Sequence, residues 1–491
     1  MDAVILMTKI PNVNNTKTRL KTILSPSQRV NLSYGLIDNI LNILKDYKVI
    51  LALTPDNLID DFKKDYDYEI IPQVPGNEGD KMEGAIETVL AMGYDKVVLI
   101  GSDIVNFDEE IFKDAFKALD DKEVVYSPTE DGGYSLIGMK KPHRELFADL
   151  KYSHKDVSKD LFDLITENNL SVKVLRKTRD IDIDLDFVTY LTGEDEVKLI
   201  GRGEYNANYL IKDDYLVRIA LGSQMHLDDQ IGYEYKALKF LEKSQVTPKA
   251  YGLYTDELSG ASYLTEEYLH GRVLDYQRDL DTAAYLLAKV HALDSSGTDF
   301  IRAEKPFEMM FEEFVEMFGH YRAWDKKDET VEEKISSMLD FVKSLGLDSK
   351  IENPTLINTE LNNGNFIIGN RPENSYIIDW EKPIIGEIEQ DLAHFLAPTT
   401  TFWKTDIIFD LATMGDFLDK YDSYSKFKVN REKLVKYILF TCLRGITWSA
   451  MAYTQYVDRG ETEGYTFEKI RGYLDMDFLS KIEAFMDSLH K

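Results

Sequence analysis

KVVLIGSD, residues 96–103, is a run of apolar, mostly β-branched residues that ends in a glycine and two polar residues. Such a run is typical of a strand buried on both faces of a sheet. Three further runs have the same character: AVILMT (3–8), KVILALT (48–54) and EVVYSPT (123–129). Helix-like segments at 26–46 and 109–119 lie between these runs, and Ser25 and Pro26 are good residues to begin the first of them. Strand–helix alternation predicts a mostly parallel sheet covered by helices.

The character of the chain changes after TGEDEVK (192–198), a short polar stretch. The glycine-punctuated region 199–221 predicts antiparallel hairpins. Helical patterns then dominate, and they end in amphipathic segments at 431–456 and 466–490. A small β-rich lobe followed by a larger helical lobe is the order expected of a protein-kinase-like fold.

These patterns predict two domains in tandem. The first, residues 1–192, is an α/β/α domain of the Rossmann type. The second, residues 198–491, is a bilobal α+β domain. Its N-lobe is expected to cover about 198–270 and its helical C-lobe about 271–491.

The composition is that of a folded, acidic protein. The chain has 491 residues and a net charge of −29, which argues against binding to nucleic acid or an anionic membrane, because both need a basic surface. A single cysteine, Cys442, excludes an intramolecular disulfide and a thiolate zinc site. We see neither a secretion leader nor an apolar run of membrane-spanning length. We therefore expect a cytoplasmic protein that acts on small molecules, and its oligomeric state stays open.

Cations and a carboxylate follow two strands of the first domain. Lys9, Lys17 and Arg19 lie in the loop after the first strand, where ligands of open α/β sheets bind, and they suit a diphosphate or triphosphate. A solvated basic loop is the alternative. Asp103 ends the strand KVVLIGSD, where a carboxylate is well placed to hold Mg²⁺ or Mn²⁺.

Two more motifs add polar groups to this domain. Glu130 and Asp131 precede Gly132 and Gly133, and paired glycines permit positive φ and close approach to a ligand; a simple tight turn is the alternative. The run DIDIDLD (180–186) carries four alternating aspartates. Alternation would place them on one face of an extended segment, where repulsion calls for a cation or for solvent.

The order of these motifs resembles a branch of GT-A-fold transferases. That branch is often labelled glycosyltransferase and is related to molybdenum-cofactor and phospholactate guanylyltransferases. The resemblance covers about residues 1–192, including Gln73 and the segment 76–82. One departure is that the usual glycine of the phosphate loop is missing from Asn14-Asn15-Thr16-Lys17, so we expect a less closely wrapped loop.

The resemblance also implies roles for the motif residues. Lys9, Lys17 and Arg19 would hold nucleotide phosphates, while Asp103 and Asp182 would be metal ligands. The acceptor side would be lined by Asp131, Gly132 and Gly133.

The second domain contains a phosphotransferase pattern. Glu360 is followed five residues later by Asn365, and fourteen residues further on by Asp379, which has the shape D-x-x-x-x-N…D with Glu in the first place. In phosphotransferases the first acid accepts the hydroxyl proton, while the Asn and the later Asp hold Mg²⁺. Upstream, Arg218 and Glu234 stand where a phosphate-contacting cation and its helix partner would be.

These motifs resemble the aminoglycoside phosphotransferase and choline kinase family over about residues 198–491. The family's His-Gly-Asp reads Asn358-Thr359-Glu360 here, and its phosphate-binding Lys is Arg218. The resemblance therefore supports the fold and nucleotide binding better than it supports turnover. It also implies that Asp391 organises the catalytic loop. Phe402 and Trp403 are expected either to line an acceptor pocket or to pack in the core of the helical lobe.

Together the two halves predict a bifunctional transferase. The second domain would use ATP to phosphorylate a small alcohol, and the first would transfer a nucleotidyl group from a second NTP to a phosphorylated acceptor, with Mg²⁺ or Mn²⁺. Two alternatives remain. In one, the first domain is a glycosyltransferase that uses a nucleotide sugar. In the other, the second domain binds its ligand without turning it over.

Overall fold

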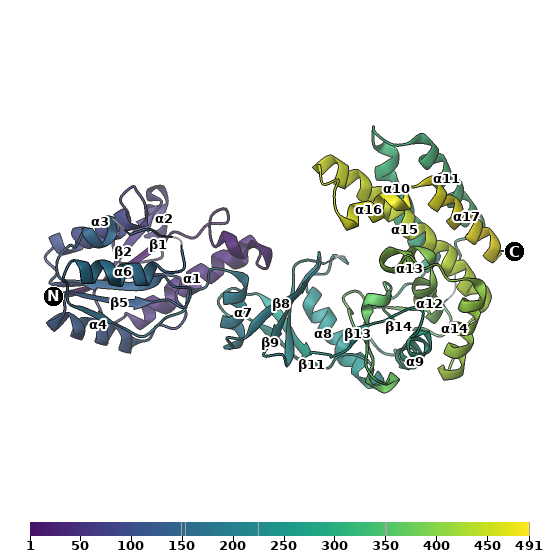
Figure 1. The fold of residues 1–491 in the computed structure, drawn as a ribbon, viewed down its shortest axis with the longest axis horizontal. Helices are drawn as coiled ribbons and strands as arrows, with labels where there is room; N and C mark the ends of the chain where they lie inside the picture. Colours follow the sequence, from purple (N-terminus) through teal and green to yellow (C-terminus); the bar gives the residue numbers. More distant parts are fainter. Residues whose placement is uncertain (149, 153, 224, 349–350, 491) are drawn as a thin grey trace. The chain divides into compact units, whose positions relative to one another are not determined.

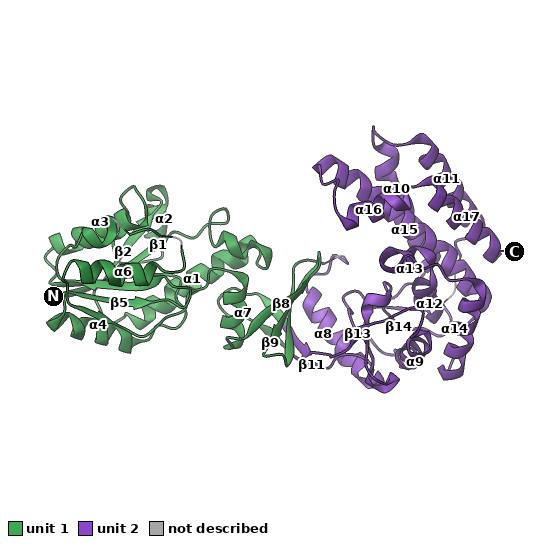
Figure 2. Ribbon diagram, viewed as in Figure 1, with its two compact units in different colours: residues 1–222, 253–263 green, residues 223–252, 264–491 purple. Residues whose placement is uncertain are grey.

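The computed structural model describes all residues except 149, 153, 224, 349–350 and 491. The chain forms two compact units, which Figure 2 colours separately. Unit 1 comprises residues 1–222 and 253–263, and unit 2 comprises residues 223–252 and 264–491. This division, which rests on contacts within each unit, does not fall at the predicted boundary, 192–198. That boundary stays a prediction.

Unit 1 begins with a seven-stranded sheet in the order β3-β2-β1-β4-β6-β5-β7. Its strands are β1 (Asp2–Lys9), β2 (Val49–Thr54), β3 (Glu69–Pro72), β4 (Lys96–Gly101), β5 (Val124–Pro128), β6 (Tyr134–Met139) and β7 (Val172–Val174). β1 pairs in parallel with both β2 and β4, whereas β6 runs antiparallel to β4 and β5. The carboxyl ends of β1 and β4 therefore lie side by side at one edge of the sheet.

Helices cover both faces of this sheet (Figure 1). The helices are α1 (Pro26–Ile43), α2 (Ile59–Phe62), α3 (Glu78–Ala91), α4 (Glu109–Asp121), α5 (Glu145–Ala148), α6 (Val157–Glu167) and α7 (Asp184–Thr192). Alternate residues of β1 enter two separate cores: Val4 packs with α1 and α4, and Ile5 packs with α3 and α6. This three-layer α/β/α arrangement confirms the predicted fold class of the first domain. Ser25 caps α1 as predicted, in a capping box with Gln28.

A third core joins this domain to the hairpins that follow it. The hairpin strands are β8 (Val197–Arg202), β9 (Asn206–Ile211) and β10 (Tyr215–Ala220), which pair antiparallel as predicted. They belong to a sheet of order β11-β12-β10-β9-β8, with β11 at Ala250–Thr255 and β12 at Ser262–Glu267. The buried Leu32 of α1 and Phe187 of α7 share one apolar cluster with Tyr209 and Val217 of the hairpins. The hairpins are therefore packed onto the α/β domain rather than joined to it by a free linker.

Unit 2 is mostly helical. Its helices are α8 (Gln230–Leu241), α9 (Leu280–His291), α10 (Pro306–Ala323), α11 (Glu329–Ser344), α12 (Ile388–Leu396), α13 (Pro398–Thr405), α14 (Leu411–Tyr424), α15 (Arg431–Arg459), α16 (Tyr465–Tyr473) and α17 (Met476–His490). Two small sheets accompany them: β13 (Arg272–Val273) with β15 (Phe366–Ile368) and β16 (Tyr376–Ile377), and β14 (Thr355–Ile357) with β17 (Ile384–Gly386). A strand-rich region followed by a helical one confirms the predicted order. None of the helices described is both long and apolar enough to cross a membrane.

Candidate active sites

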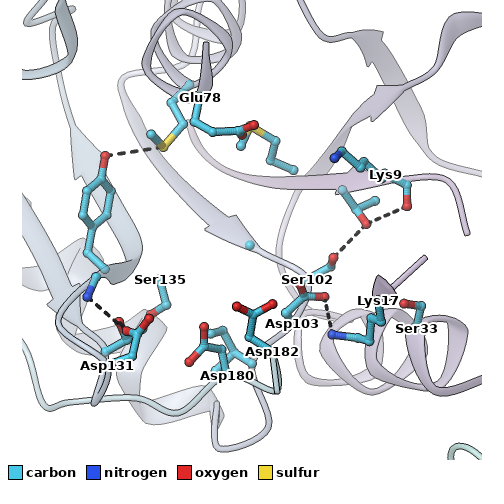
Figure 3. A pocket seen from close by; sticks show the side chains of 18 of the residues that line it. Lys9, Lys17, Ser33, Glu78, Ser102, Asp103, Asp131, Ser135, Asp180 and Asp182 are labelled. Atoms are coloured by element: carbon cyan, nitrogen blue, oxygen red, sulfur yellow. Dashed lines mark hydrogen bonds and ion pairs between the residues drawn. The ribbon is translucent and has the colours of Figure 1, made fainter. Parts of the chain in front are cut away.

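A pocket of about 540 Å³ lies at the carboxyl ends of β1 and β4 in unit 1. We call it the N-terminal pocket (Figure 3). Its wall includes most of the residues that the sequence singled out for this domain: Lys9, Lys17, Arg19, Asp103, Asp131, Gly133 and Asp182. Gly132 is not part of the wall. Thr8, Gln73 and Ser102 also line the pocket, and the sequence assigned them no role.

Two of the cations are already paired with the two predicted metal ligands. Lys17 donates to the carbonyl oxygen of Ile181 at 2.8 Å, and its Nζ lies 3.1 Å from Asp103 Oδ1. The Lys17 side chain is only 6% exposed, so these two contacts fix it firmly. Arg19 forms an ion pair with Asp182, and both side chains are exposed. Two cations and two carboxylates of the pocket wall are thus paired with each other.

The loop that lacks the usual glycine is closed by side chains instead. The Asn12 side-chain oxygen accepts from the N–H groups of Asn14 and Asn15, each at 3.1 Å, and Thr16 Oγ1 accepts from the Asn12 N–H at 2.7 Å. Lys17 itself has φ 43°, in the left-handed region that glycine adopts most easily. The loop therefore reaches a turn geometry without a glycine.

The acidic run is extended only in its first half. Asp180 and Asp182 line the N-terminal pocket, but α7 begins at Asp184. Asp186 accepts from the N–H groups of Asp182 at 3.0 Å and Ile183 at 2.8 Å. The prediction that all four carboxylates share one face of an extended segment was wrong, because the last two stabilise the first turn of a helix.

Asp184 ties this segment to the hairpin sheet. Its Oδ2 accepts from Arg202 Nη2 at 2.7 Å and from the Tyr209 hydroxyl at 2.9 Å. Arg202 lies in β8 and Tyr209 in β9, and Tyr209 is fully buried. The strands that follow the α/β domain therefore hold the segment that carries Asp182 into the pocket.

Electrostatic repulsion is concentrated at Asp180. Burial, together with the negative charges of Asp131, Asp186 and Asp103, raises the pKa of Asp180 to about 6. Repulsion from the neighbouring carboxylates raises the free energy of ionising Asp180, and a bound divalent cation would lower it.

We expect Asp180→Asn to raise the free energy of unfolding above pH ~6, because an ionised Asp180 then destabilises the native state. The gain should shrink as the pH falls from about 6 toward 4 and disappear below about 4, where Asp180 is protonated in both states. Urea denaturation at several pH values measures this difference. The matched control is Asp114→Asn, at an exposed position of α4. An equal gain from both variants would contradict the account.

Gly132 shapes the turn beside the pocket rather than its wall. It has φ +95°, and an added Cβ would lie 1.7 Å from the Lys155 carbonyl oxygen. The Asp131 side chain accepts from the Gly133 N–H at 3.0 Å and from the Thr129 hydroxyl, so the turn is held by its own residues.

Gly132→Ala is therefore expected to destabilise unit 1 strongly, with a lower unfolding midpoint in thermal denaturation. Gly93→Ala is the matched control, because Gly93 has φ +97° but open space around the position of a Cβ. Both variants carry the strain of positive φ, about 1–2 kcal/mol, and only Gly132→Ala adds the steric clash. Equal midpoints for the two variants would mean that the clash is relieved.

The carboxylates of the N-terminal pocket fit a metal bound together with a nucleotide. Among the residues described, no group of three or more His, Cys, Asp or Glu side chains is placed to hold a metal. Mg²⁺ is commonly bound by one or two carboxylates together with substrate phosphates. Asp103 and Asp182 supply two carboxylates beside the cations that would bind those phosphates.

In unit 2, Asp391 organises the loop that follows β14, as the resemblance implied. Its carboxylate accepts from the N–H groups of Asn358 and Thr359, each at 2.9 Å, and is fully buried. His291 Nε2 lies 3.3 Å from the same carboxylate. These contacts hold the backbone just before Glu360.

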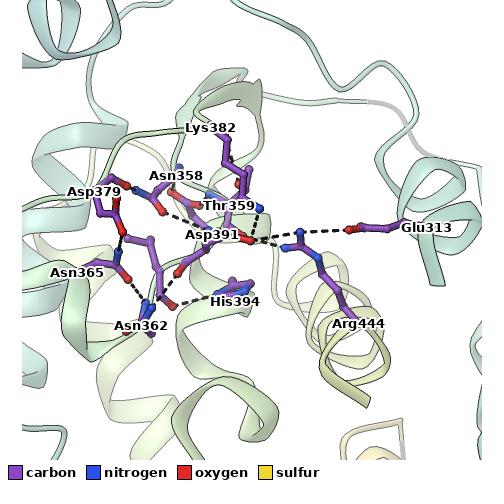
Figure 4. A network of polar contacts seen from close by, with 12 residues as sticks. Glu313, Asn358, Thr359, Asn362, Asn365, Asp379, Lys382, Asp391, His394 and Arg444 are labelled. Carbon is purple, nitrogen blue, oxygen red and sulfur yellow. Dashed lines mark hydrogen bonds and ion pairs between the residues drawn. The ribbon is translucent and has the colours of Figure 1, made fainter. Parts of the chain in front are cut away.

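The structure brings Asn365 and Asp379 together (Figure 4). Asn365 Nδ2 donates to Asp379 Oδ2 at 3.4 Å, and Asn365 Oδ1 accepts from the Asn362 N–H at 2.8 Å. Asn358 Nδ2 donates to the Asp379 carbonyl at 2.8 Å. The Asn365 amide group and the Asp379 carboxylate thus lie together, and amide and carboxylate oxygens are both suitable ligands for Mg²⁺.

Glu360 lies between two cations that sequence reasoning missed. It forms an ion pair with Lys382, and Arg444 Nη2 lies 3.6 Å from its Oε1. Burial raises the pKa of Glu360, but the charges of Lys382 and Arg444 outweigh burial and lower it overall. Lys382 follows Asp379 closely in the sequence, so its approach could have been suspected; nothing local points to Arg444, which lies on α15.

The remaining predicted residues, Arg218 and Glu234, belong to different units. Arg218 is buried in β10 of unit 1, with Nη1 3.5 Å from Asn208 Oδ1. Glu234 is buried in α8 of unit 2, where it accepts from Gln230 Nε2 at 2.9 Å. Their roles in phosphate binding stay predictions.

Phe402 and Trp403 pack against aromatic residues of the helical region. Phe402 contacts Phe478, and Trp403 contacts Trp448 and Tyr473. These contacts support the alternative that the two residues belong to the core of the helical lobe.

Comparison with known proteins gives separate matches for the two halves. Residues 41–154 match the family described as "Uncharacterized protein conserved in bacteria (DUF2064)", and residues 196–425 match the "Phosphotransferase enzyme family". A 2-phospho-L-lactate guanylyltransferase from Methanosphaera stadtmanae is 26% identical over 221 residues, which are 43% of this chain and 90% of that protein. One from Methanocaldococcus sp. is 25% identical over 205 residues, 40% of this chain and 82% of that protein.

Solved structures are similar to each half in turn. A protein from Desulfovibrio desulfuricans described as a nucleotide-diphospho-sugar transferase has a TM-score of 0.38 and 25% identity, over 40% of this chain and 88% of that one. A choline/ethanolamine kinase family protein from Mesorhizobium loti has a TM-score of 0.41 and 15% identity, over 60% of this chain and 95% of that one. The family and sequence matches confirm both predicted resemblances, and they identify the chain as a transferase.

Proposed function

We propose that the chain is a bifunctional enzyme that phosphorylates a small alcohol and then activates the product with a nucleotide. Unit 2 would transfer the γ-phosphoryl group of ATP to the alcohol. The N-terminal pocket would transfer a nucleotidyl group from a second NTP to the phosphorylated product. The observation that carries the proposal is the gathering of Lys17, Arg19, Asp103 and Asp182 in one pocket.

The relatives of the first half favour a particular pair of substrates. Their name, 2-phospho-L-lactate guanylyltransferase, describes transfer of a guanylyl group to a phosphorylated hydroxy acid. We therefore propose GTP as the second NTP and a phosphorylated small acid as the acceptor. We also expect the enzyme to work in the cytoplasm, where both nucleotides are available.

In the N-terminal pocket, Lys9, Lys17 and Arg19 would bind the triphosphate, and Asp131 and Gly133 would border the acceptor. An oxygen of the acceptor phosphate attacks the α-phosphorus, and the bond from that phosphorus to the bridging oxygen breaks, so that pyrophosphate leaves. Asp103 and Asp182 would hold Mg²⁺ or Mn²⁺, which neutralises charge on the phosphates.

The cations distinguish this reaction from glycosyl transfer. Nucleotidyl transfer must bind a triphosphate and stabilise departing pyrophosphate, which carries more charge than the diphosphate of a nucleotide sugar. Three cations around one pocket meet that larger charge. Glycosyl transfer from a nucleotide sugar remains the alternative function of this domain.

In unit 2, Glu360 would accept the proton of the attacking hydroxyl. Lys382 and Arg444 keep its carboxylate ionised and hold it in place. Because phosphoryl transfer depends mostly on positioning and charge stabilisation, an ionised and firmly placed carboxylate can serve despite a low pKa. Asn365 and Asp379 would hold Mg²⁺, which neutralises charge on the phosphates of ATP.

The experiment that tests the proposal is incubation of the purified chain with a panel of NTPs and nucleotide sugars plus a small-molecule extract. Mass spectrometry identifies the products. Release of pyrophosphate together with a new nucleotide-linked compound supports nucleotidyl transfer. A glycoside with release of a nucleoside diphosphate would establish the alternative.

Arg19→Ala is expected to weaken nucleotide binding by about 1.5–3 kcal/mol, the usual contribution of a hydrogen bond to a charged group. Isothermal titration calorimetry with the NTP measures it. Lys21→Ala is the matched control, because Arg19 and Lys21 share the short 3₁₀ helix Thr18–Thr22, and Lys21 is exposed but does not line the pocket. Unchanged affinity in Arg19→Ala would count against a phosphate site there.

A further inference from the structure

A second cavity, of about 290 Å³, lies beside the Glu360 network in unit 2. We call it the α10 cavity, because Pro306, Met309 and Met310 of α10 form part of its wall. Most of the wall is apolar. The volume is at the lower end of the range for small-molecule sites, about 300–1,000 Å³. The cavity therefore fits a compact molecule with a short apolar skeleton.

Charged groups gather along one side of this cavity. Lys382, Arg444 and Glu313 all line it, and Glu360 lies between the two cations. Lys382, Glu360 and Arg444 together carry one net positive charge. The positive group that remains available to a ligand is the guanidinium of Arg444, whose planar fork matches a carboxylate.

Glu313 is the group that balances this charge, and it is the more exposed partner. Its Oε1 lies 3.3 Å from Arg444 Nη2, and its side chain is 40% exposed, against 20% for Arg444. Arg444 is also held from behind, because its Nη1 donates to the Thr359 carbonyl at 3.2 Å. A ligand carboxylate can therefore replace Glu313 at a cation that stays in position.

Two other polar groups of the wall are neutral. Burial, with the nearby charge of Arg444, lowers the pKa of His394 to about 4, so its ring carries no charge at neutral pH. The side-chain oxygen of Gln390 is buried and has no hydrogen-bond partner among the residues described. A hydrogen-bond donor on the ligand would satisfy that oxygen.

We propose that the α10 cavity binds the carboxylate of a small hydroxy acid on Arg444 and presents its hydroxyl to Glu360. This inference rests on the proposed phosphoryl transfer, and it names the substrate class. The hydroxyl oxygen forms a bond to the γ-phosphorus of ATP. The bond from that phosphorus to the β–γ bridging oxygen breaks, ADP leaves, and the hydroxyl proton passes to the Glu360 carboxylate.

The same side chains disfavour a cationic acceptor. An ammonium group would lie beside Lys382 and Arg444, and the two carboxylates here, Glu360 and Glu313, are already paired with those cations. The part of the wall that the structure describes contains no aromatic ring other than His394, so a quaternary ammonium group would find no aromatic cage.

Three probes of one size test this charge preference. Lactate, propane-1,2-diol and 1-amino-2-propanol share a carbon skeleton and a secondary hydroxyl, and they differ in carrying a carboxylate, a hydroxyl or an ammonium group. With ATP and Mg²⁺, we expect kcat/KM to be highest for lactate and lowest for the amine. An equal or higher value for the diol or the amine would overturn the proposal.

Two variants test the same preference through the ratio of kcat/KM for lactate to kcat/KM for the diol. This ratio cancels any effect on the chemical step that the two probes share. Glu313→Gln should raise this ratio by about threefold or more, because it removes the competing carboxylate. Arg444→Gln should lower it by about tenfold or more. Glu312→Gln is the control, because Glu312 is an exposed neighbour on α10 that does not line the cavity. A ratio that does not respond to Glu313→Gln would contradict the proposal.

Failure of the proposed phosphoryl transfer gives a different result. In that case no probe and no extract component yields ADP or a phosphorylated product. Calorimetry of the three probes with the protein bound to a non-hydrolysable ATP analogue then decides the inference alone. Lactate must bind most tightly and must respond to Glu313→Gln, and any other order would overturn it.

Discussion

Asp103→Asn is expected to abolish transfer in the N-terminal pocket, by about two orders of magnitude or more, while the fold stays intact. Asp103 follows the end of β4 at the edge of the pocket, and a metal-binding carboxylate contributes several kcal/mol of transition-state stabilisation. Asparagine removes the charge but keeps an oxygen that can accept from Lys17. Release of pyrophosphate in Mg²⁺ and in Mn²⁺ measures the effect.

Asp103→Ala separates the structural role of the residue from its catalytic one. It also removes the ion-pair partner of Lys17. The Lys17 side chain is almost completely buried, and it keeps its hydrogen bond to the Ile181 carbonyl oxygen. We therefore expect a lower thermal midpoint for the alanine variant than for the asparagine variant. Normal turnover of Asp103→Asn with either metal would mean that Asp103 is not a metal ligand.

Glu360→Gln is expected to lower phosphoryl transfer by about 10²–10⁴-fold, the usual effect of losing a general base. ATP affinity should be unchanged, because Glu360 contacts Lys382 and Arg444 rather than the predicted metal ligands. Asp379→Asn is the contrasting variant, and it should also weaken Mg²⁺-dependent ATP binding. Transfer rates and ATP titrations distinguish the two.

Glu360→Asp tests whether the site is adapted to glutamate. It draws the carboxylate back by one methylene, away from Lys382 and Arg444. A site built around these two cations loses activity in the aspartate variant, and we expect that loss. A gain of activity would mean that the glutamate marks a decayed site. If neither the wild type nor either variant transfers a phosphoryl group, unit 2 is a binding module.

The sequence predicted the parts of the fold and site that depend on local pattern. Buried β-branched runs predicted four strands of the seven-stranded sheet, β1, β2, β4 and β5, and Ser25 with Pro26 predicted the start of α1. The placement of Lys17 and Asp103 at the carboxyl ends of neighbouring strands follows from parallel pairing, which brings such ends to one edge.

What the sequence could not predict depends on contacts between distant segments. Arg444 reaches Glu360 only because α15 packs against α10 and α12, and its own helix gives no sign of this. The alternating aspartates looked extended, but Asp186 accepts from the backbone N–H groups that open α7. The core that α7 shares with the hairpins is likewise a tertiary feature that no local pattern indicates.

The most direct test of two linked transferase sites is a complementation experiment with the full chain. Wild type, Asp103→Asn and Glu360→Gln are each incubated with ATP, GTP, Mg²⁺ and lactate, and products are identified by mass spectrometry. We predict that the wild type makes a guanylylated phospho-acid and that Asp103→Asn accumulates the phosphorylated acid. Glu360→Gln should make neither until the phosphorylated acid is added, and mixing the two variants should restore the product. A guanylylated product whose formation does not require Glu360, or phosphorylated acid that the wild type never converts, would contradict the account.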